Sequence, residues 1–309
     1  MDIRVRRGYP SALLVNSESP NAQPDPSKPL PRLVVRDFGK VYGEHRAVSG
    51  LSFHVQAGEI LGLVGPNGAG KTTTLRSIAG ILPIQEGRIL VAGHDVATEE
   101  EKAKSELAWV PDDPQPFDAL TVDEHMEFMA RLYGVADWQP LADELLDKFE
   151  LTEKRDALGG ELSRGMRQKL AISCAWLSSP KVVLLDEPLS GLDPRGIRSA
   201  RVAIRELADH GVAVILSTHL LELIEALADR ILIMDRGEKL FGGTLGEARE
   251  RVVADSGSTL EEIFMAATEG LESTPPLGSD RPAGPGDPAG SARPPGVDAV
   301  GPESVFQDD

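Results

Sequence analysis

Residues 60–73 read Ile60-Leu61-Gly62-Leu63-Val64-Gly65-Pro66-Asn67-Gly68-Ala69-Gly70-Lys71-Thr72-Thr73. The first five residues are almost continuously apolar, which predicts a short strand buried on both faces of a sheet. The next eight match the pattern of a glycine, any four residues and Gly-Lys-Thr, which is typical of phosphate-binding loops, and Thr73 follows them. Apolar residues at helical spacing follow as far as Leu82, so the loop joins a predicted strand to a predicted helix.

The segment Gly65–Thr73 has the composition needed to bind the phosphates of a nucleotide. Its glycines let backbone N–H groups point inward around phosphate oxygens, and the start of the helix adds partial positive charge. We expect Lys71 to reach the β- and γ-phosphates and the Thr72 hydroxyl to hold Mg²⁺. The remaining residues of the segment are expected to surround the phosphates.

A second apolar run, Val182–Leu185, ends in the carboxylates Asp186 and Glu187. Ligands of open α/β sheets collect at the carboxyl ends of the strands, where these two side chains are expected to lie. Asp186 is placed to hold Mg²⁺, directly or through water, and Glu187 to polarise the attacking water. Together with the glycine-rich loop, this pair indicates a nucleoside triphosphatase.

Strand and helix patterns alternate on either side of these motifs. We predict further strands at 33–38, 51–55, 212–216 and 231–234, and helices around 198–208 and 221–228. This alternation is typical of a parallel sheet covered by helices. Residues from about 99 to 180 are charged and helix-forming, so we expect them to form a helical subdomain inserted between two halves of the sheet.

Composition limits the possible classes of protein. The chain of 309 residues has 32 Lys and Arg against 49 Asp and Glu, a formal net charge of −17, which argues against broad binding to nucleic acid. The single cysteine, Cys174, excludes an intrachain disulfide and is expected in the core. No apolar run approaches the roughly 20 residues of a membrane-spanning helix. The sequence therefore favours an intracellular globular protein.

Both ends of the chain are rich in proline. Residues 1–31 contain six prolines, and residues 271–309 contain eight prolines and six glycines. Such segments bury too little apolar surface to offset their ordering entropy, so we predict a disordered N-terminal extension and a disordered acidic tail. The expected folded domain is 32–270.

A third motif indicates which class of nucleoside triphosphatase the chain resembles. Leu162-Ser163-Arg164-Gly165-Met166 lies shortly before the strand that ends in Asp186. With the two motifs above, it makes the chain resemble the ATP-binding cassette (ABC) ATPase family over nearly all of 32–270. This segment resembles the family signature, with Arg164 and Met166 where Gly and Gln are usual. The resemblance implies that Ser163 and Gly165 contact the γ-phosphate of ATP held by an opposite subunit.

Three other segments extend the resemblance. Ser190-Gly191-Leu192-Asp193 resembles the loop that couples two nucleotide sites in the family. His219 resembles the switch histidine that contacts the γ-phosphate, and Tyr42 matches the aromatic residue that stacks on adenine. The resemblance thus implies catalytic roles for Glu187, Lys71 and His219.

One position departs from the family pattern. The sequence Trp109-Val110-Pro111-Asp112-Asp113-Pro114 places Asp112 where the family has a glutamine that offers a neutral oxygen to Mg²⁺ or to the attacking water. A carboxylate is a more strongly held ligand for Mg²⁺, so Asp112 is a candidate metal ligand beside Thr72 and Asp186. The alternative is that Asp112 only shapes the turn between two prolines.

The resemblance implies an α/β fold: a P-loop NTPase (RecA-like) core, an antiparallel β subdomain and an inserted helical subdomain. It also implies an ATPase with ATP and Mg²⁺, paired as a homodimer or heterodimer of ATPase subunits and energising a separate integral membrane permease. Such a subunit is expected in the cytoplasm, peripheral on the inner face of the cell membrane. The segment Leu260–Met265 resembles the close of exporter-type subunits, and no large regulatory domain follows it, so export is favoured over import.

Two alternatives from other classes remain. A soluble ABC-type ATPase that acts as a mechanical switch on ribosomes or DNA would need two cassettes or a long coiled-coil insertion, and neither is present. A binding module that uses ATP only as a clamp would be expected to lose Glu187 or Lys71, and both are present.

Overall fold

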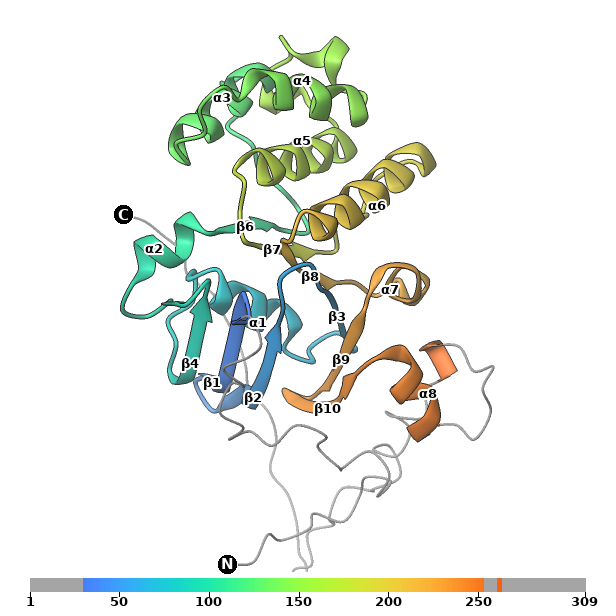
Figure 1. The fold of residues 1–309 in the computed structure, drawn as a ribbon. Coiled ribbons are helices and arrows are strands. Elements are labelled where there is room, and N and C mark those ends of the chain that lie inside the picture. Colours follow the sequence, from blue (N-terminus) through green and yellow to red (C-terminus); the bar gives the residue numbers. More distant parts are fainter. Residues whose placement is uncertain (1–29, 253–259, 263–309) are drawn as a thin grey trace, which may run out of the picture. The chain divides into compact units, whose positions relative to one another are not determined.

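The computed structural model describes residues 30–252 and 260–262, which contain two sheets (Figure 1). The smaller sheet is antiparallel, with strand order β2-β1-β4-β5. Its strands are β1 (Leu33–Tyr42), β2 (His45–Val55), β4 (Glu86–Val91) and β5 (His94–Asp95). This sheet is the antiparallel β subdomain that the resemblance implied.

The larger sheet has six strands in the order β10-β9-β3-β8-β7-β6. All neighbouring pairs are parallel except the edge pair of β9 and β10. The strands are β3 (Ile60–Val64), β6 (Leu107–Val110), β7 (Val182–Asp186), β8 (Ala213–Ser217), β9 (Arg230–Asp235) and β10 (Glu238–Gly243). Strand β8 lies between β3 and β7, and all three run in the same direction. Their carboxyl ends therefore lie side by side at one end of the sheet.

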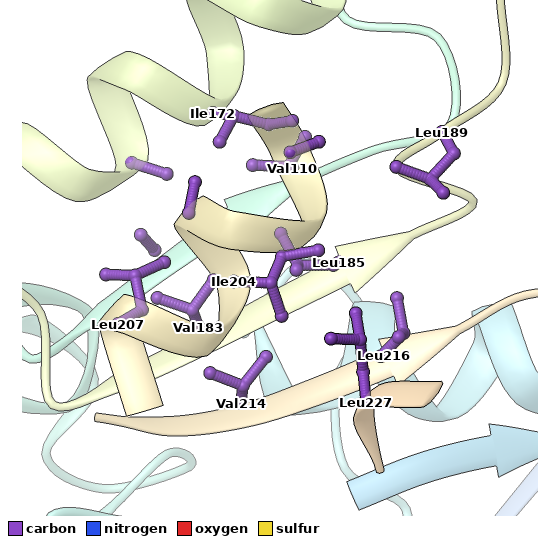
Figure 2. Close-up of a cluster of buried hydrophobic side chains, with 14 of the residues drawn as sticks. Val110, Ile172, Val183, Leu185, Leu189, Ile204, Leu207, Val214, Leu216 and Leu227 are labelled. Atoms are coloured by element: carbon purple, nitrogen blue, oxygen red, sulfur yellow. The ribbon is translucent and has the colours of Figure 1, made fainter. Parts of the chain in front are cut away.

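Alternate residues of the central strands enter two different cores. In β7, Val183 and Leu185 face one core, and Val182 and Leu184 face the other. This follows from the two-residue repeat of a strand, and it explains why these strands read as continuous apolar runs. Figure 2 shows the first core, where Ile204 lies close to the side chains from β7 and β8.

The helices cover both faces of the parallel sheet. Helix α1 (Lys71–Ile78) packs in the core shared with the antiparallel sheet, whereas α6 (Pro194–Asp209) and α7 (Leu221–Leu227) pack in the opposite core. Helices α3 (Val122–Leu132) and α4 (Gln139–Lys148) both contact α5 (Arg164–Leu177), and α5 also contacts β6 and α6. The other helices are α2 (Glu100–Ser105), η1 (Thr152–Lys154), η2 (Gly159–Glu161) and α8 (Leu245–Val252).

The α/β fold with an inserted helical group is confirmed, with local differences. Helix α1 ends at Ile78 rather than Leu82, because Gly80 adopts a left-handed backbone conformation with φ +66°. The expected helical range of about 99–180 includes two elements that belong with the sheets: β6 is a strand of the larger sheet, and α2 packs against strands of both sheets. The inserted helical group consists of α3 to α5 (Figure 1). Cys174 is buried in the core as expected, and burial raises the pKa of its thiol to about 12.

The expected disordered segments fall mostly outside the described residues, as does Ile263–Met265 of the exporter-like segment. Along the described part of the chain, no helix is both long enough and apolar enough to cross a membrane.

Candidate functional site

The glycine-rich loop joins β3 to α1, as its sequence predicts. Gly68 and Gly70 have φ angles of +83° and +99°, which a residue with a side chain adopts only under strain. A Cβ atom at Gly70 would also lie 2.7 Å from the carbonyl oxygen of Ala47 in β2. The loop therefore requires glycine at these positions to turn tightly between strand and helix while it packs against the smaller sheet.

Lys71 is the first residue of α1 and is mostly buried. Its Nζ donates hydrogen bonds to the carbonyl oxygens of Gly65, at 2.7 Å, and Pro66, at 3.1 Å. Burial lowers the pKa of Lys71, and the nearby carboxylates of Glu187 and Asp186 oppose that shift. A partly desolvated cation at a helix N-terminus fits an anionic phosphate group.

Asp186 ends β7 and is buried. Burial raises the pKa of this carboxyl, a hydrogen bond with the Thr72 side chain lowers it, and the charges of Glu187 and Asp112 raise it further. The Thr72 hydroxyl and the Asp186 carboxylate thus lie together. Such an oxygen pair fits Mg²⁺, which is usually held by one or two protein oxygens together with substrate phosphates.

Glu187 is fixed by the two residues that follow β8. Its Oε2 accepts a hydrogen bond from the Thr218 hydroxyl, and its Oε1 accepts one from the backbone N–H of His219, each at 2.9 Å. The His219 Nδ1 also lies 2.9 Å from Glu187 Oε2. Glu187 has a φ of +50°, a strained conformation for a residue other than glycine, and such strain clusters at functional sites.

The strand order explains this contact. Glu187 and His219 are 32 positions apart, but β7 and β8 are neighbours whose carboxyl ends lie together. The backbone N–H of Glu187 donates to the carbonyl oxygen of Ser217, at 2.8 Å, which extends the strand pairing by one residue. The structure therefore brings together Lys71, Asp186, Glu187 and His219, as the sequence predicts.

The signature segment, Leu162–Met166, lies at the start of α5. The Ser163 hydroxyl caps this helix by accepting a hydrogen bond from the backbone N–H of Met166, at 3.3 Å. Gly165 packs closely against the loop after β7, since a Cβ atom there would lie 2.6 Å from the carbonyl oxygen of Gly191. Contact of Ser163 and Gly165 with a nucleotide on another subunit stays a prediction.

Asp112 lies in the loop after β6, residues 111–117, where it contacts the signature segment. Its Oδ1 accepts a hydrogen bond from Arg164 Nη2 at 3.1 Å, and the same nitrogen donates to the Ser190 hydroxyl at 2.9 Å. These contacts were not foreseen from the sequence. The available signal was that two of the three departures from the family pattern, Asp112 and Arg164, have opposite charges.

Tyr42 ends β1 at the hairpin with β2, and the residue is about half exposed. The Nζ of Lys40 lies 5.7 Å from the centre of the ring. An exposed aromatic face at the end of a strand is available for stacking, so the expected contact with adenine stays a prediction. His125 is buried, and its Nε2 accepts a hydrogen bond from the backbone N–H of Phe117 at 2.9 Å.

A phosphate-binding loop after β3, with an Asp-Glu pair two strands away, defines a P-loop nucleoside triphosphatase. Comparison with known proteins gives the family. A family model described as "ABC transporter" matches residues 48–190. The linearmycin resistance ATP-binding protein LnrL of Bacillus subtilis (strain 168) is 33% identical over 246 residues, 77% of this chain and 79% of that protein.

A second relative is the Nod factor export ATP-binding protein I of Burkholderia pseudomallei (strain 1710b). It is 37% identical, and the match covers 74% of this chain and 76% of that protein. A solved ATP-binding subunit of an ABC transporter has a TM-score of 0.73 and 31% identity, and the match covers 76% of this chain and 99% of that chain. The chain belongs to the ABC transporter ATP-binding family, whose members hydrolyse ATP to drive transport.

Proposed function

We propose that this chain binds ATP with Mg²⁺ and hydrolyses the γ-phosphate bond as the nucleotide-binding subunit of an ABC exporter. The observation that carries the proposal is the position of Glu187. Its carboxylate is held by Thr218 and His219 at the carboxyl ends of the parallel strands, where Lys71 also begins α1. A carboxylate fixed in this way is suited to accept a proton from an attacking water.

Each residue at this end of the sheet has a separate task in the proposed reaction. The backbone N–H groups of Gly65–Thr73 and the Lys71 ammonium bind the β- and γ-phosphates and offset the charge that develops on them. Thr72 and Asp186 are the residues that would hold Mg²⁺, which neutralises phosphate charge when bound. Glu187 orients the water, and His219 contacts the γ-phosphate while it fixes Glu187.

Ser163 and Gly165 complete the site from a second ATPase subunit in this proposal. The start of α5 is oriented by the Ser163 cap, and a helix N-terminus favours bound anions. Tyr42 stacks on the adenine ring. We place Asp112 at the edge of the metal site, because its charge acts on Asp186.

A pocket supports the proposed membrane partner. It has a volume of about 270 Å³ and is lined by the loop after β6 and by residues of β6, α3 and α5, including Trp109, Pro114, Phe128 and Leu170. Phe117 and Phe128 are 58% and 41% exposed beside one another, with ring centres 5.4 Å apart. Exposed apolar patches often mark interaction surfaces. We propose that a segment of the permease docks here, which places the subunit on the inner face of the membrane.

Export is the proposed direction. Relatives include proteins named for linearmycin resistance, daunorubicin and doxorubicin resistance, and Nod factor export. The cargo itself is selected by the membrane subunit in this proposal.

The test is isolation of the tagged subunit from detergent-solubilised membranes of its own host. We expect one integral membrane protein to co-purify and ATP to be hydrolysed. Phe117→Ala should release that protein. Val202→Ala, at a similarly exposed apolar side chain on α6 (47%), should retain it. Recovery with ribosomes or nucleic acid, and not with a membrane protein, would instead support the mechanical-switch alternative.

A further inference from the structure

Arg164 connects three segments around the proposed nucleotide site. The guanidinium Nη2 contacts Asp112 in the loop after β6 and Ser190 in the loop after β7, and Arg164 itself begins α5 next to the Ser163 cap. Asp112 and Arg164 are 52 positions apart in the chain. Two of the three residues that depart from the family pattern, Arg164 and Asp112, therefore contact each other directly.

A second ion pair repeats this arrangement. Arg167 Nη2 lies 3.5 Å from Asp113 Oδ1, and Gln115 Nε2 donates to Asp113 Oδ2 at 2.7 Å. Arg164 and Arg167 are three residues apart on α5, so they lie on one face of the helix. Two consecutive aspartates thus form ion pairs with two arginines that are three residues apart on one helix.

The helix dipole accounts for the sign of these charges. The first turn of α5 has no acidic residue, and Arg164 occupies its first position. Cations are unfavourable at a helix N-terminus, whereas carboxylates are favourable there. Asp112 and Asp113 supply the missing negative charge from a different segment of the chain.

Stability alone does not account for the pair. The side chains of Arg164 and Asp112 are 47% and 53% exposed, and ion pairs at such positions contribute little to folding. However, the Arg164 nitrogen that contacts Asp112 also donates to Ser190, whose backbone N–H donates to the carbonyl oxygen of Glu187 at 3.1 Å. Asp112 therefore adds a carboxylate close to the place where phosphates are proposed to bind. An uncompensated negative charge at this place opposes binding of an anionic nucleotide.

We propose that Arg164 is a positioning residue that neutralises Asp112 and holds the loop after β6 beside the signature segment. The inference rests on the proposed function. When Arg164 loses its charge, Asp112 repels the nucleotide. When both charges are removed, the repulsion disappears. A double substitution should therefore bind ATP better than the single substitution at Arg164.

The test compares Arg164→Gln, Asp112→Asn and the double variant in the purified subunit. ATP affinity is measured with EDTA, so that no metal contributes, and ATP hydrolysis is measured against Mg²⁺ concentration. We expect Arg164→Gln to weaken ATP binding about three- to tenfold and to raise the Mg²⁺ concentration for half-maximal hydrolysis. The double variant should return to the level of Asp112→Asn.

The matched control is Arg205→Gln. Arg205 Nη1 pairs with Asp229 Oδ1 at 3.3 Å, and both side chains are partly exposed (38% and 43%). Arg205 is in α6 and Asp229 directly precedes β9, so the pair lies at the amino-terminal end of that strand, whereas the phosphate loop follows the carboxyl end of the parallel strand β3. The control variant should match the unsubstituted subunit in both measurements.

Two results would overturn the inference alone: an unchanged Arg164→Gln variant, or equal impairment of the single and double variants. Equal impairment would show that Arg164 acts independently of Asp112. An unsubstituted subunit that binds ATP but does not hydrolyse it would overturn the proposed function, while the binding measurement still decides the inference. A subunit that does not bind ATP would overturn both.

Discussion

The two sides of the candidate site are built by different means. The phosphate-loop side, Gly65–Thr73 with Asp186 and Glu187, has the expected residue at each position that the phosphate-binding pattern specifies. The signature side, Leu162–Met166 with the loop after β6, has Arg164, Met166 and Asp112 where other residues are usual. The first side depends on backbone geometry next to a strand, whereas the second depends on charged side chains that contact each other. The difference indicates that substitution is tolerated where a neighbouring side chain can compensate for it.

The largest effect is expected at Lys71 on the phosphate-loop side. Lys71→Ala should abolish measurable ATP hydrolysis, because it removes the cation that meets the β- and γ-phosphates. A circular dichroism spectrum should show an intact fold. Lys104→Ala, which removes an exposed pair with Glu100 on α2, is the control and should keep full turnover. Near-normal turnover of Lys71→Ala would contradict the catalytic assignment of this side.

The next effect concerns Glu187. Glu187→Gln keeps the size of the side chain but removes the base, and loss of a general base costs about 10²–10⁴ in rate. ATP binding should persist, so this variant should accumulate as an ATP-bound dimer on size exclusion. A variant that stays monomeric with saturating ATP and Mg²⁺ would argue against a site shared between two subunits.

Gly165→Ala tests whether the signature side also has a backbone requirement. The new Cβ would lie 2.6 Å from the carbonyl oxygen of Gly191, so α5 and the loop after β7 must separate. We expect hydrolysis to fall severalfold and the free energy of unfolding to drop by about 1–3 kcal/mol. Gly246→Ala in α8 meets no atom closer than 3.8 Å and should change neither quantity. If Gly165→Ala behaves like the unsubstituted protein, the signature side has no such backbone requirement, and its structure depends mainly on its charged side chains.

A smaller effect on stability is expected at Asp186. Burial raises the pKa of this carboxyl in the folded protein, so its charged form opposes folding at pH values above that pKa. Asp186→Asn should therefore raise the melting temperature of the nucleotide-free protein at neutral pH, although it removes a proposed metal ligand. A gain of about 1 kcal/mol corresponds to about 2–4 °C in a domain of this size.

The pH dependence gives the control for that prediction. As the pH falls from the raised pKa toward the ordinary pKa of aspartate, Asp186 becomes protonated in the folded protein and its penalty shrinks to zero, so the two melting temperatures should converge. A difference that grows at low pH would contradict burial as the cause of the shift.

The smallest effect is expected outside both sides of the site. A chain that ends at Gly270 should hydrolyse ATP like the full chain, because residues 271–309 are rich in proline and glycine. Leu260, which is buried and whose backbone N–H donates to Glu225 Oε1, is kept in this variant. Loss of activity or of folding would show that the tail packs on the domain.

Sequence patterns predicted β3, β7, β8 and β9 of the parallel sheet, but β6 lies in the range that was expected to be helical, and other elements did not stand out. Strand β4 opens with the exposed residues Glu86, Gly87 and Arg88, so its apolar pattern is too short to read. Within the part of the chain that the structure describes, strand β10 pairs with β9 alone, and its six residues include two glycines. Such strands depend on a neighbour for their hydrogen bonds more than on their own residue pattern.

The sequence by itself determined the phosphate loop and the acidic end of β7, because each is a short segment whose chemistry depends on local backbone and residue type. Only the tertiary structure decided that Glu187 contacts Thr218 and His219, since the order of strands in the sheet differs from their order in the chain. It also decided the contact between Asp112 and Arg164. Their pairing requires α5 to pack beside β6, which no local pattern specifies.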